Sequence, residues 1–431
     1  MTATWETETI EIQQTLFQRW SEIRAPYRAM LVAFGALVVL SLVRWGTGSE
    51  DLTSSGTAAA TLRLAVPIFF AGLGGLYSER AGIVNIGLEG MMILGTWSSA
   101  WAGFTWGVWW GVLAALIGGA IGGLFHAVAT ITFGVDHVVS GVAINIIALG
   151  LARYLASEVF TTRGGSEANS PQVKGDVGEF TVPFLSGGKL FGWSSPDILG
   201  WFDDRNWVVV SDFAGLASGL TTGLSNLTLI AIALIPTTTY VLYRTRFGLR
   251  LRASGENPNA PDSQGVSVYG IRYAAVSISG ALAGLGGAFL VIEGARIYRE
   301  GQTAGRGFIA LAALIFGNWH AAGVAAGSTL FGFANALELR QEGTVHSLLL
   351  FVAIVVAVLA VRAFLQMNPR SVLLLSATSI GFFLAWLFTD SVASQFLSFT
   401  PHLTVLIVLT FASQRLRPPM AIGMLWRKGD A

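Results

Sequence analysis

Residues 76–92 read LYSERAGIVNIGLEGMM, and this polar, glycine-containing stretch separates two apolar runs at 58–76 and 88–106. A helix that crosses a lipid bilayer needs roughly 20 mostly apolar residues, and each run approaches that length. Of the 431 residues, 53% are hydrophobic and only 12% are charged, whereas a soluble domain of ordinary composition carries about 25% charge. The sequence therefore predicts an all-α, polytopic membrane helix bundle. It argues against a soluble enzyme, a nucleic-acid-binding protein or a disordered chain.

Further apolar stretches bring the number of candidate membrane helices to about twelve. In order they are 30–44, 58–76, 88–106, 108–130, 138–160, 222–243, 271–293, 307–318, 321–339, 346–365, 371–389 and 400–413. The segment at 307–318 is too short to span a bilayer comfortably, so we interpret it as either a short span or a re-entrant helix. Small-residue spacings such as Gly119-xxx-Gly123 and Gly280-xxx-Gly284 predict a tightly packed bundle.

The placement of arginine predicts the orientation, because cytoplasmic loops of membrane proteins hold an excess of Lys and Arg. Arginines concentrate in the N-terminal segment 1–29, in the loop at 244–270 and near the C-terminus. Twelve crossings that start inside put these regions, and both termini, in the cytoplasm. Residues 30–431 then form one transmembrane domain, whose long connection at 161–221 is external. We interpret this connection as a solvated loop with a surface helix and tryptophans at the lipid headgroups, with capture of a partner protein as the alternative.

Several kinds of chemistry need residues that this chain lacks. Without cysteine there is no disulfide, thiolate metal site or thiol nucleophile. The 5 histidines are scattered and never form an i, i+4 pair of metal ligands. No phosphate-binding loop of the G-x-x-x-x-G-K-[ST] type occurs, so any ATP hydrolysis must reside in a separate chain. The sequence thus predicts no catalytic residue, no metal ligand and no cofactor.

Ionisable groups at membrane depth are costly and usually functional, which singles out the stretch with Glu79, Arg80, Asn85 and Glu89. Its glycines permit a break in the helix, and irregular backbone at membrane depth survives only where protein or a cavity satisfies it. Asn85 and Glu89 share a face if the segment is helical. Two interpretations stay open: the segment lines a transport path, or it is an ordinary cytoplasmic turn with Glu79 and Arg80 solvated.

Asn145 lies within the otherwise apolar run at 138–160. A hydrogen bond that packs helices together is the commoner role for such a residue in a membrane bundle. Contact with a transported substrate is the alternative.

The loop at 244–270 contains signals for a short helix. Asn257 or Asn259 can cap a helix whose first turn accepts proline, and Gly265 can end it. Because Pro261 interrupts this region, the helix is expected to start at Asn259. A helix this short is marginal alone, so either a partner docks against it or the loop is mobile.

Three long motifs carry a resemblance to a known family. They are SERAGIVNIGLEGMM at 78–92, FGLRLRA followed by GENP at 247–258, and AGRGFIALAALIFG at 304–317, and SGVAIN at 140–145 fits the same pattern. In this order they resemble permease subunits of ABC importers in the simple-sugar and nucleoside branch. The resemblance runs from about residue 60 to 340 and resumes near 400–428.

The resemblance implies a ten-helix permease that forms a heterodimer with a second, homologous permease in the plasma membrane. An ATPase subunit, which binds the ATP, docks from the cytoplasm, and a substrate-binding lipoprotein docks outside. The residues that match segments lining the substrate path are Asn85, Glu89 and Asn145. The residues that match the element coupling the permease to the ATPase are Arg250, Gly255, Glu256, Asn257 and Pro258.

The resemblance leaves open the substrate and the role of an additional helix pair. This pair, near 346–389, is an insertion relative to the ten core spans. Nucleosides are the favoured substrate class for such a non-catalytic transporter subunit, with simple sugars such as ribose or galactose as the alternative. An ion-coupled secondary transporter is a less favoured reading, because Glu89 is the only good candidate for a protonatable group deep in the bundle.

Overall fold

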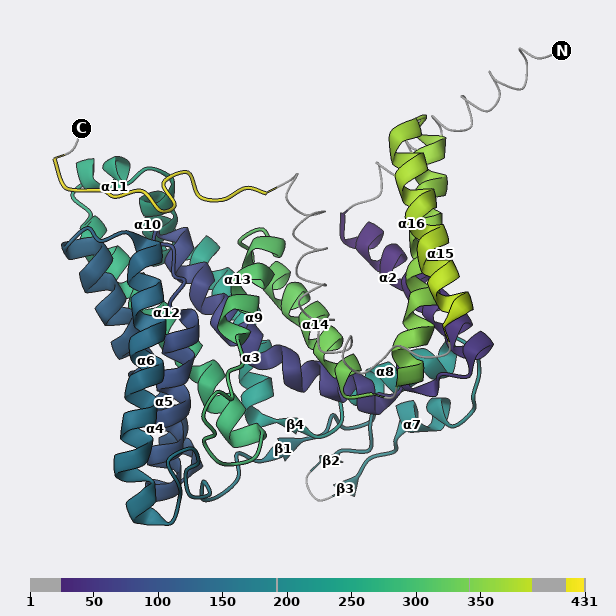
Figure 1. Cartoon of the computed structure of the whole chain (residues 1–431), viewed down its shortest axis with the longest axis horizontal. Coiled ribbons are helices and arrows are strands. Elements are labelled where there is room, and N and C mark those ends of the chain that lie inside the picture. Colours follow the sequence, from purple (N-terminus) through teal and green to yellow (C-terminus); the bar gives the residue numbers. More distant parts are fainter. Residues whose placement is uncertain (1–24, 191–192, 341, 390–415, 430–431) are drawn as a thin grey trace. The chain divides into compact units, whose positions relative to one another are not determined.

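The computed structural model describes residues 25–190, 193–340, 342–389 and 416–429 (Figure 1). Eleven of the twelve predicted spans coincide with helices in these residues, and the twelfth, at 400–413, lies outside them. Eight of the described helices are long and apolar enough to cross a bilayer. The predicted all-α membrane bundle is therefore confirmed.

The chain divides into two compact units, and each is described by itself. The larger takes its described residues from 60–181, 223–336 and 400–431, and the smaller from 1–59, 182–222 and 337–399. Two helices have residues in both units: α3 (Ser55–Arg80) and α14 (Ala321–Glu338).

The larger unit is a helix bundle in which α4, α5 and α12 pack against one another. Its elements are α4 (Leu88–Trp106), α5 (Val108–Ala127), the π-helical turn η2 (Val128–Thr132), α6 (His137–Val159), η3 (Thr161–Arg163), α9 (Asn226–Arg244), α10 (Arg246–Glu256), α11 (Asn259–Ser263), α12 (Val268–Glu293) and α13 (Arg306–Phe316), with most of α3 and α14. The short strands β1 (Glu179–Phe180) and β4 (Leu224–Ser225) pair antiparallel, Glu179 opposite Ser225. In Figure 1 this strand pair lies at one end of the unit, and α10, α11 and the C-terminal residues lie at the other.

Glycines bring α5 and α12 into backbone contact, as the small-residue spacings predict. A Cβ atom on Gly119 would collide with the carbonyl oxygen of Gly280, and one on Gly284 with that of Ala115. In a bilayer, such close approach replaces the hydrophobic effect as the source of packing energy between helices.

The helix α13 is short for a membrane element. Its 11 residues extend roughly 16 Å at 1.5 Å per residue. The hydrocarbon core is about 30 Å thick, so α13 covers only part of it and cannot span the bilayer by itself.

The smaller unit contains the remaining helices and a two-stranded hairpin. Its elements are α2 (Ala25–Thr47), η1 (Glu50–Leu52), β2 (Lys189–Leu190), β3 (Trp193–Ser194), α7 (Ile198–Asp203), α8 (Val210–Gly219), α15 (Glu342–Leu365) and α16 (Pro369–Phe388). The pair expected near 346–389 is the α15–α16 hairpin, and α15 also packs against α2. No residue of α16 is buried; an apolar helix exposed in this way fits a surface in contact with lipid.

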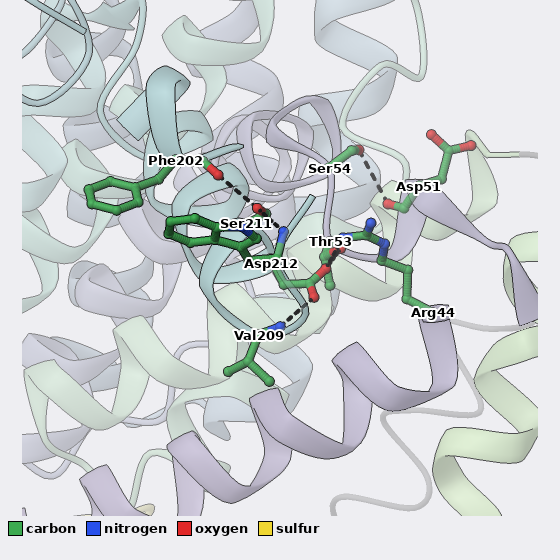
Figure 2. Close-up of polar contacts among 9 residues, drawn as sticks. Arg44, Asp51, Thr53, Ser54, Phe202, Val209, Ser211 and Asp212 are labelled. Atoms are coloured by element: carbon green, nitrogen blue, oxygen red, sulfur yellow. Dashed lines mark hydrogen bonds and ion pairs between the residues drawn. The ribbon is translucent and has the colours of Figure 1, made fainter. Parts of the chain in front are cut away.

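Figure 2 shows how α8 is fixed within the smaller unit. Arg44 Nη1 lies 2.6 Å from Asp212 Oδ1, to which the Thr53 hydroxyl also donates, and Val209 N donates to Asp212 Oδ2 at 3.2 Å. Burial alone would raise the pKa of Asp212, but the hydrogen bonds from Thr53 and Arg44 outweigh it and hold the pKa below its ordinary value of 3.8. Asp212 is therefore a charged anchor for the segment 182–222.

Candidate functional site

The polar stretch at residues 79–89, here called the polar segment, breaks the chain between α3 and α4. The helix ends at Arg80, and Gly82 takes a positive φ of 93° that side-chain-bearing residues rarely adopt. Ser78 satisfies the broken backbone twice over: its carbonyl accepts from Ala81 N and Ile83 N, and its hydroxyl donates to the Ile83 carbonyl at 2.6 Å. The predicted helix break is therefore present, and the protein itself satisfies its backbone.

Glu89 caps the N-terminus of α13. Its side chain is buried, and its two carboxylate oxygens accept hydrogen bonds from Gly305 N at 3.0 Å and Gly307 N at 2.7 Å. Carboxylates are stabilised at helix N-termini because the unpaired N–H groups and the helix dipole both favour negative charge. A Cβ atom on Gly307 would lie 2.6 Å from Glu89 Cα, so glycine permits this approach.

Asn145 binds the backbone on both sides of Glu89. Its Oδ1 accepts from Gly90 N at 2.7 Å, and its Nδ2 donates to the Ile86 carbonyl at 3.1 Å. These bonds join α6 to the polar segment, which is the helix-packing role weighed for Asn145 from the sequence.

Asn85 is fully buried and only partly satisfied. Its Nδ2 donates to Ser279 Oγ at 2.8 Å. Among the described residues its Oδ1 finds no donor. The structure thus gathers Asn85, Glu89 and Asn145 around one break in the chain, and Asn85 keeps the one unpaired acceptor of the three.

The loop at 244–270, here called the docking loop after the role that the sequence predicts for it, forms two helices. The predicted short helix is confirmed as α11, which starts at Asn259, and Gly265 follows it with a positive φ of 74°. The preceding α10 was not expected from the sequence. Its signal is Thr245, whose hydroxyl accepts from Gly248 N at 3.1 Å as an N-cap.

The five residues predicted to contact a partner at this loop fall into two groups. Arg250, Glu256 and Asn257 are exposed, whereas Gly255 and Pro258 are buried. A Cβ atom on Gly255 would collide with the carbonyl oxygen of Arg80. Gly255 therefore lets α10 lie directly on the polar segment.

A C-terminal segment, residues 416–429, lies along the docking loop. Ala421 N donates to the Gly255 carbonyl at 2.8 Å, and Gly423 N donates to the Gly82 carbonyl at 3.0 Å. The Trp426 indole N–H donates to Asn259 Oδ1 at 2.6 Å. Sequence reasoning missed these contacts, because they join residues more than 160 positions apart in the chain.

Glu79 and Arg80 are both buried, so the interpretation of the pair as solvated is wrong. Glu79 Oε2 accepts from the Trp319 indole N–H at 2.6 Å. Arg80 donates to the Trp319 carbonyl from Nε at 3.0 Å and from Nη2 at 2.7 Å. The sequence offered no signal for this partner, because Trp319 follows the polar segment by more than 200 residues.

The turn that contains Trp319 is strained. Asn318 and Trp319 have φ values of 50° and 54°, in the left-handed region that disfavours residues with side chains. Each such residue costs on the order of 1–3 kcal/mol and persists only where its surroundings hold it. The bonds from Glu79 and Arg80, with that from Arg417 N to Asn318 Oδ1 at 2.8 Å, provide this hold.

Within the described residues, no group of three or more His, Asp or Glu side chains is placed to hold a metal ion. The polar groups of the site instead bind N–H groups, carbonyls and hydroxyls of the chain itself. Such an arrangement fixes backbone breaks in a helix bundle; it offers no nucleophile paired with a base.

The chain matches the family model described as "Branched-chain amino acid transport system / permease component" over residues 57–361. It is 37% identical to the guanosine ABC transporter permease protein NupQ of Bacillus subtilis, over 65% of this chain and 81% of that protein. It has the same identity and coverage with the nucleoside ABC transporter permease protein NupC of Lactococcus lactis. A putative glucose ABC transporter permease of Haloferax volcanii is 30% identical, over 67% of this chain and 78% of that protein.

No solved structure matches the chain. The family match covers well over half of the residues, and it confirms the resemblance to ABC importer permeases of the simple-sugar and nucleoside branch. The chain therefore belongs to the branched-chain amino acid transport system / permease component family, as a multi-pass, non-catalytic permease subunit of the plasma membrane.

Proposed function

We propose that this chain forms half of the translocation pathway of an ATP-driven importer of nucleosides. The observation that carries the substrate class is the 37% identity to two permeases named for guanosine and nucleoside transport, over 81% of each. A simple sugar is the second candidate, favoured by the 30% identity to a putative glucose permease.

The partners follow from the family. An ATPase subunit binds ATP and docks on the cytoplasmic face, a substrate-binding lipoprotein delivers the substrate outside, and a second, homologous permease completes the pathway as a heterodimer. The chain itself needs no cofactor, because the chemical step takes place in the ATPase. Lipid covers the apolar outer helix faces, among them that of α16, in which no residue is buried.

The substrate path is proposed to pass the polar segment at Asn85, Glu89 and Asn145. The unpaired Oδ1 of Asn85 supports this assignment, because a buried acceptor without a donor is a natural partner for a ligand hydroxyl or N–H group. Glu89 and Asn145 shape the path by holding the backbone of α13 and α4 in place.

The ATPase is proposed to dock on the docking loop through Arg250, Glu256 and Asn257, which are exposed. Gly255 and Pro258 are buried and support the loop from beneath. The position of α10 and α11 supports this proposal. They lie at the same end of the larger unit as the C-terminal segment, which the arginine placement predicts to be cytoplasmic (Figure 1).

Orientation can be tested with single cysteines, because the native chain has none. Ser263 in the docking loop and Glu167 in the connection after α6 are both exposed. An impermeant thiol reagent added outside intact cells should label Glu167→Cys and not Ser263→Cys. The reverse pattern would place the docking loop outside and remove the basis for ATPase docking there.

Substrate and energy source can be tested with the assembled transporter in proteoliposomes. We expect uptake of labelled guanosine to require ATP and the binding protein, and to persist when ion gradients are collapsed. Unlabelled nucleosides should compete and glucose should not. Uptake that needs only a proton or sodium gradient would support a secondary transporter, and competition by glucose alone would support the sugar assignment.

A further inference from the structure

The polar segment holds α13 at both of its ends. At the N-terminus, the Glu89 carboxylate accepts from Gly305 N and Gly307 N. Beyond the C-terminus, Glu79 and Arg80 bind Trp319 in the turn that leads to α14. One continuous stretch of chain therefore fixes the position of a helix that is too short to anchor itself across the membrane.

The contact at Trp319 has an unusual composition. Glu79 and Arg80 are a buried acid and a buried base that are neighbours in sequence, yet among the described residues neither forms an ion pair. Both side chains bind one residue instead, Glu79 its indole N–H and Arg80 its carbonyl, and Arg80 Nη2 also donates to the Tyr243 hydroxyl at 3.3 Å. If Trp319 moved away, both buried side chains would lose these hydrogen bonds at once, so the end of α3 and this turn are expected to move together.

The docking loop rests on the same short stretch. Gly255 of α10 lies against the backbone of Arg80 and Gly82, and Ser254 Oγ donates to the Ala81 carbonyl at 3.2 Å. Arg272 of α12 donates to the Ser254 carbonyl at 3.2 Å and holds α10 in this place. A displacement of α10 would therefore act directly on residues 80–82, which continue into the groups that bind Trp319.

We propose that Glu79, Arg80 and Trp319 form a latch, here called the Trp319 latch, through which movement of the docking loop displaces α13. The inference rests on the proposed function, because docking of the ATPase at this loop supplies the movement. The three side chains are positioning residues that act through α13 without touching substrate. The strained backbone at Trp319 fits this role. A left-handed turn persists only where its surroundings hold it, so it can relax when Glu79 and Arg80 move away.

Trp319→Phe tests the latch with the smallest change. It keeps an aromatic ring but removes the N–H that Glu79 accepts. Trp97→Phe is the matched control: Trp97 Nε1 is also buried, and among the described residues it has no hydrogen-bond partner. Both variants thus lose a buried indole N–H from the same bundle, and only Trp319→Phe loses a hydrogen bond of the Trp319 latch.

The first measurement uses the full-length permease alone and needs no substrate. Gly255→Ala pushes α10 off the Arg80 carbonyl, and it should raise amide hydrogen exchange at residues 317–320 by about tenfold in the native background. In the Trp319→Phe background the added increase should fall below about twofold, as expected once two sites are uncoupled. An equal increase in both backgrounds would overturn the proposal. Ser254→Ala is the milder perturbation if Gly255→Ala does not fold.

The second measurement uses the assembled transporter. Trp319→Phe should leave copurification with the ATPase and ATP hydrolysis within about twofold of native, while nucleoside uptake per ATP falls about tenfold. Trp97→Phe should leave that ratio unchanged. An unchanged ratio in Trp319→Phe would overturn the latch. If the native transporter takes up no nucleoside, the proposed function fails, and the exchange measurement still decides the latch.

Discussion

Two buried carboxylates, Asp212 in α8 and Glu89 in α4, are held in different ways. Asp212 pairs with a cation, the guanidinium of Arg44 at 2.6 Å. Glu89 faces two backbone N–H groups at the start of α13. Both arrangements satisfy a charge away from water, but the first joins two full charges and the second joins a charge to the end of a helix.

The two ways of holding a carboxylate indicate which region is rigid and which can move. A buried ion pair is costly to open, because each partner left alone is an uncompensated charge. The partners of Glu89 are neutral N–H groups, so moving α13 away strands one buried charge rather than two, at about 1.5–3 kcal/mol for a hydrogen bond to a charged group. We infer that the segment around α8 is a fixed anchor and that the junction of α4 with α13 is a movable joint.

The largest expected effect comes from breaking the anchor. Arg44→Ala leaves the buried Asp212 carboxylate without its cation, although Thr53 and Val209 N still donate to it, and should destabilise α8 against local opening by about 3–5 kcal/mol. Hydrogen exchange of residues 210–219 measures this opening. Arg153→Ala is the control, because it removes an exposed ion pair: Arg153 lies 3.8 Å from Glu300 and is 69% exposed. Exposed pairs contribute little, so this variant should leave the protection of residues 210–219 nearly unchanged. Unchanged protection in Arg44→Ala would show that the ion pair does not anchor α8.

The next effect comes from loosening the joint. Glu89→Gln keeps one acceptor for the N–H groups of α13 but removes the charge, and a hydrogen bond to a charged group is worth about 1.5–3 kcal/mol. We expect nucleoside uptake to fall about tenfold or more while the permease still assembles with its ATPase. Glu158→Gln, at an exposed glutamate of α6, should transport normally. Normal uptake by Glu89→Gln would leave only a packing role for this carboxylate.

A smaller effect is expected at the docking loop. Arg250 is exposed, so Arg250→Glu should reverse a surface charge without disturbing the fold and lower substrate-stimulated ATP hydrolysis about threefold to tenfold, as rim charges do at protein interfaces. Arg299→Glu, an exposed arginine outside the docking loop, is the control. The combined variant Glu256→Lys and Asn257→Pro should act more strongly, because it also removes the bond from Asn257 N to the Ala253 carbonyl. Full stimulated hydrolysis in both variants would exclude this loop as the docking element.

The sequence was most informative where the structure depends on local pattern. Helix positions followed from apolar runs of bilayer length, and the start of α11 at Asn259 followed from capping residues and Pro261. The bonds of Glu79 and Arg80 to Trp319 could not be foreseen, because they join residues about 240 positions apart and depend on a turn with left-handed backbone. The burial of Gly255 was missed for the same reason: the backbone that covers it belongs to Arg80 and Gly82, far away in the sequence.

The smallest expected effect concerns pH. It follows from comparing Asp212 of α8 with Asp203 of α7, which lies in the same unit. Asp212 has its pKa lowered below 3.8, because the hydrogen bonds from Thr53 and Arg44 outweigh its burial. Its contribution to stability is therefore present above about pH 4 and is lost as the pH falls through the lowered pKa of the folded state. Asp203 has the opposite shift: burial and the neighbouring Asp204 raise its pKa above 3.8. Its ionisation thus weakens the fold as the pH rises through the raised value.

These signs predict opposite outcomes for two matched substitutions. At neutral pH, Asp212→Asn should increase exchange of α8 amides, and Asp203→Asn should leave it unchanged or decrease it slightly. As the pH falls below the ordinary value of 3.8 the first difference should shrink, because the carboxylate of the opened segment takes up a proton and the charge then contributes less to closing it. Comparing each variant with the native chain at the same pH removes the intrinsic pH dependence of exchange. If Asp212→Asn differed from the native chain equally at pH 3 and pH 7, the charge of Asp212 would not be what holds α8, and the contrast with Glu89 would lose its basis.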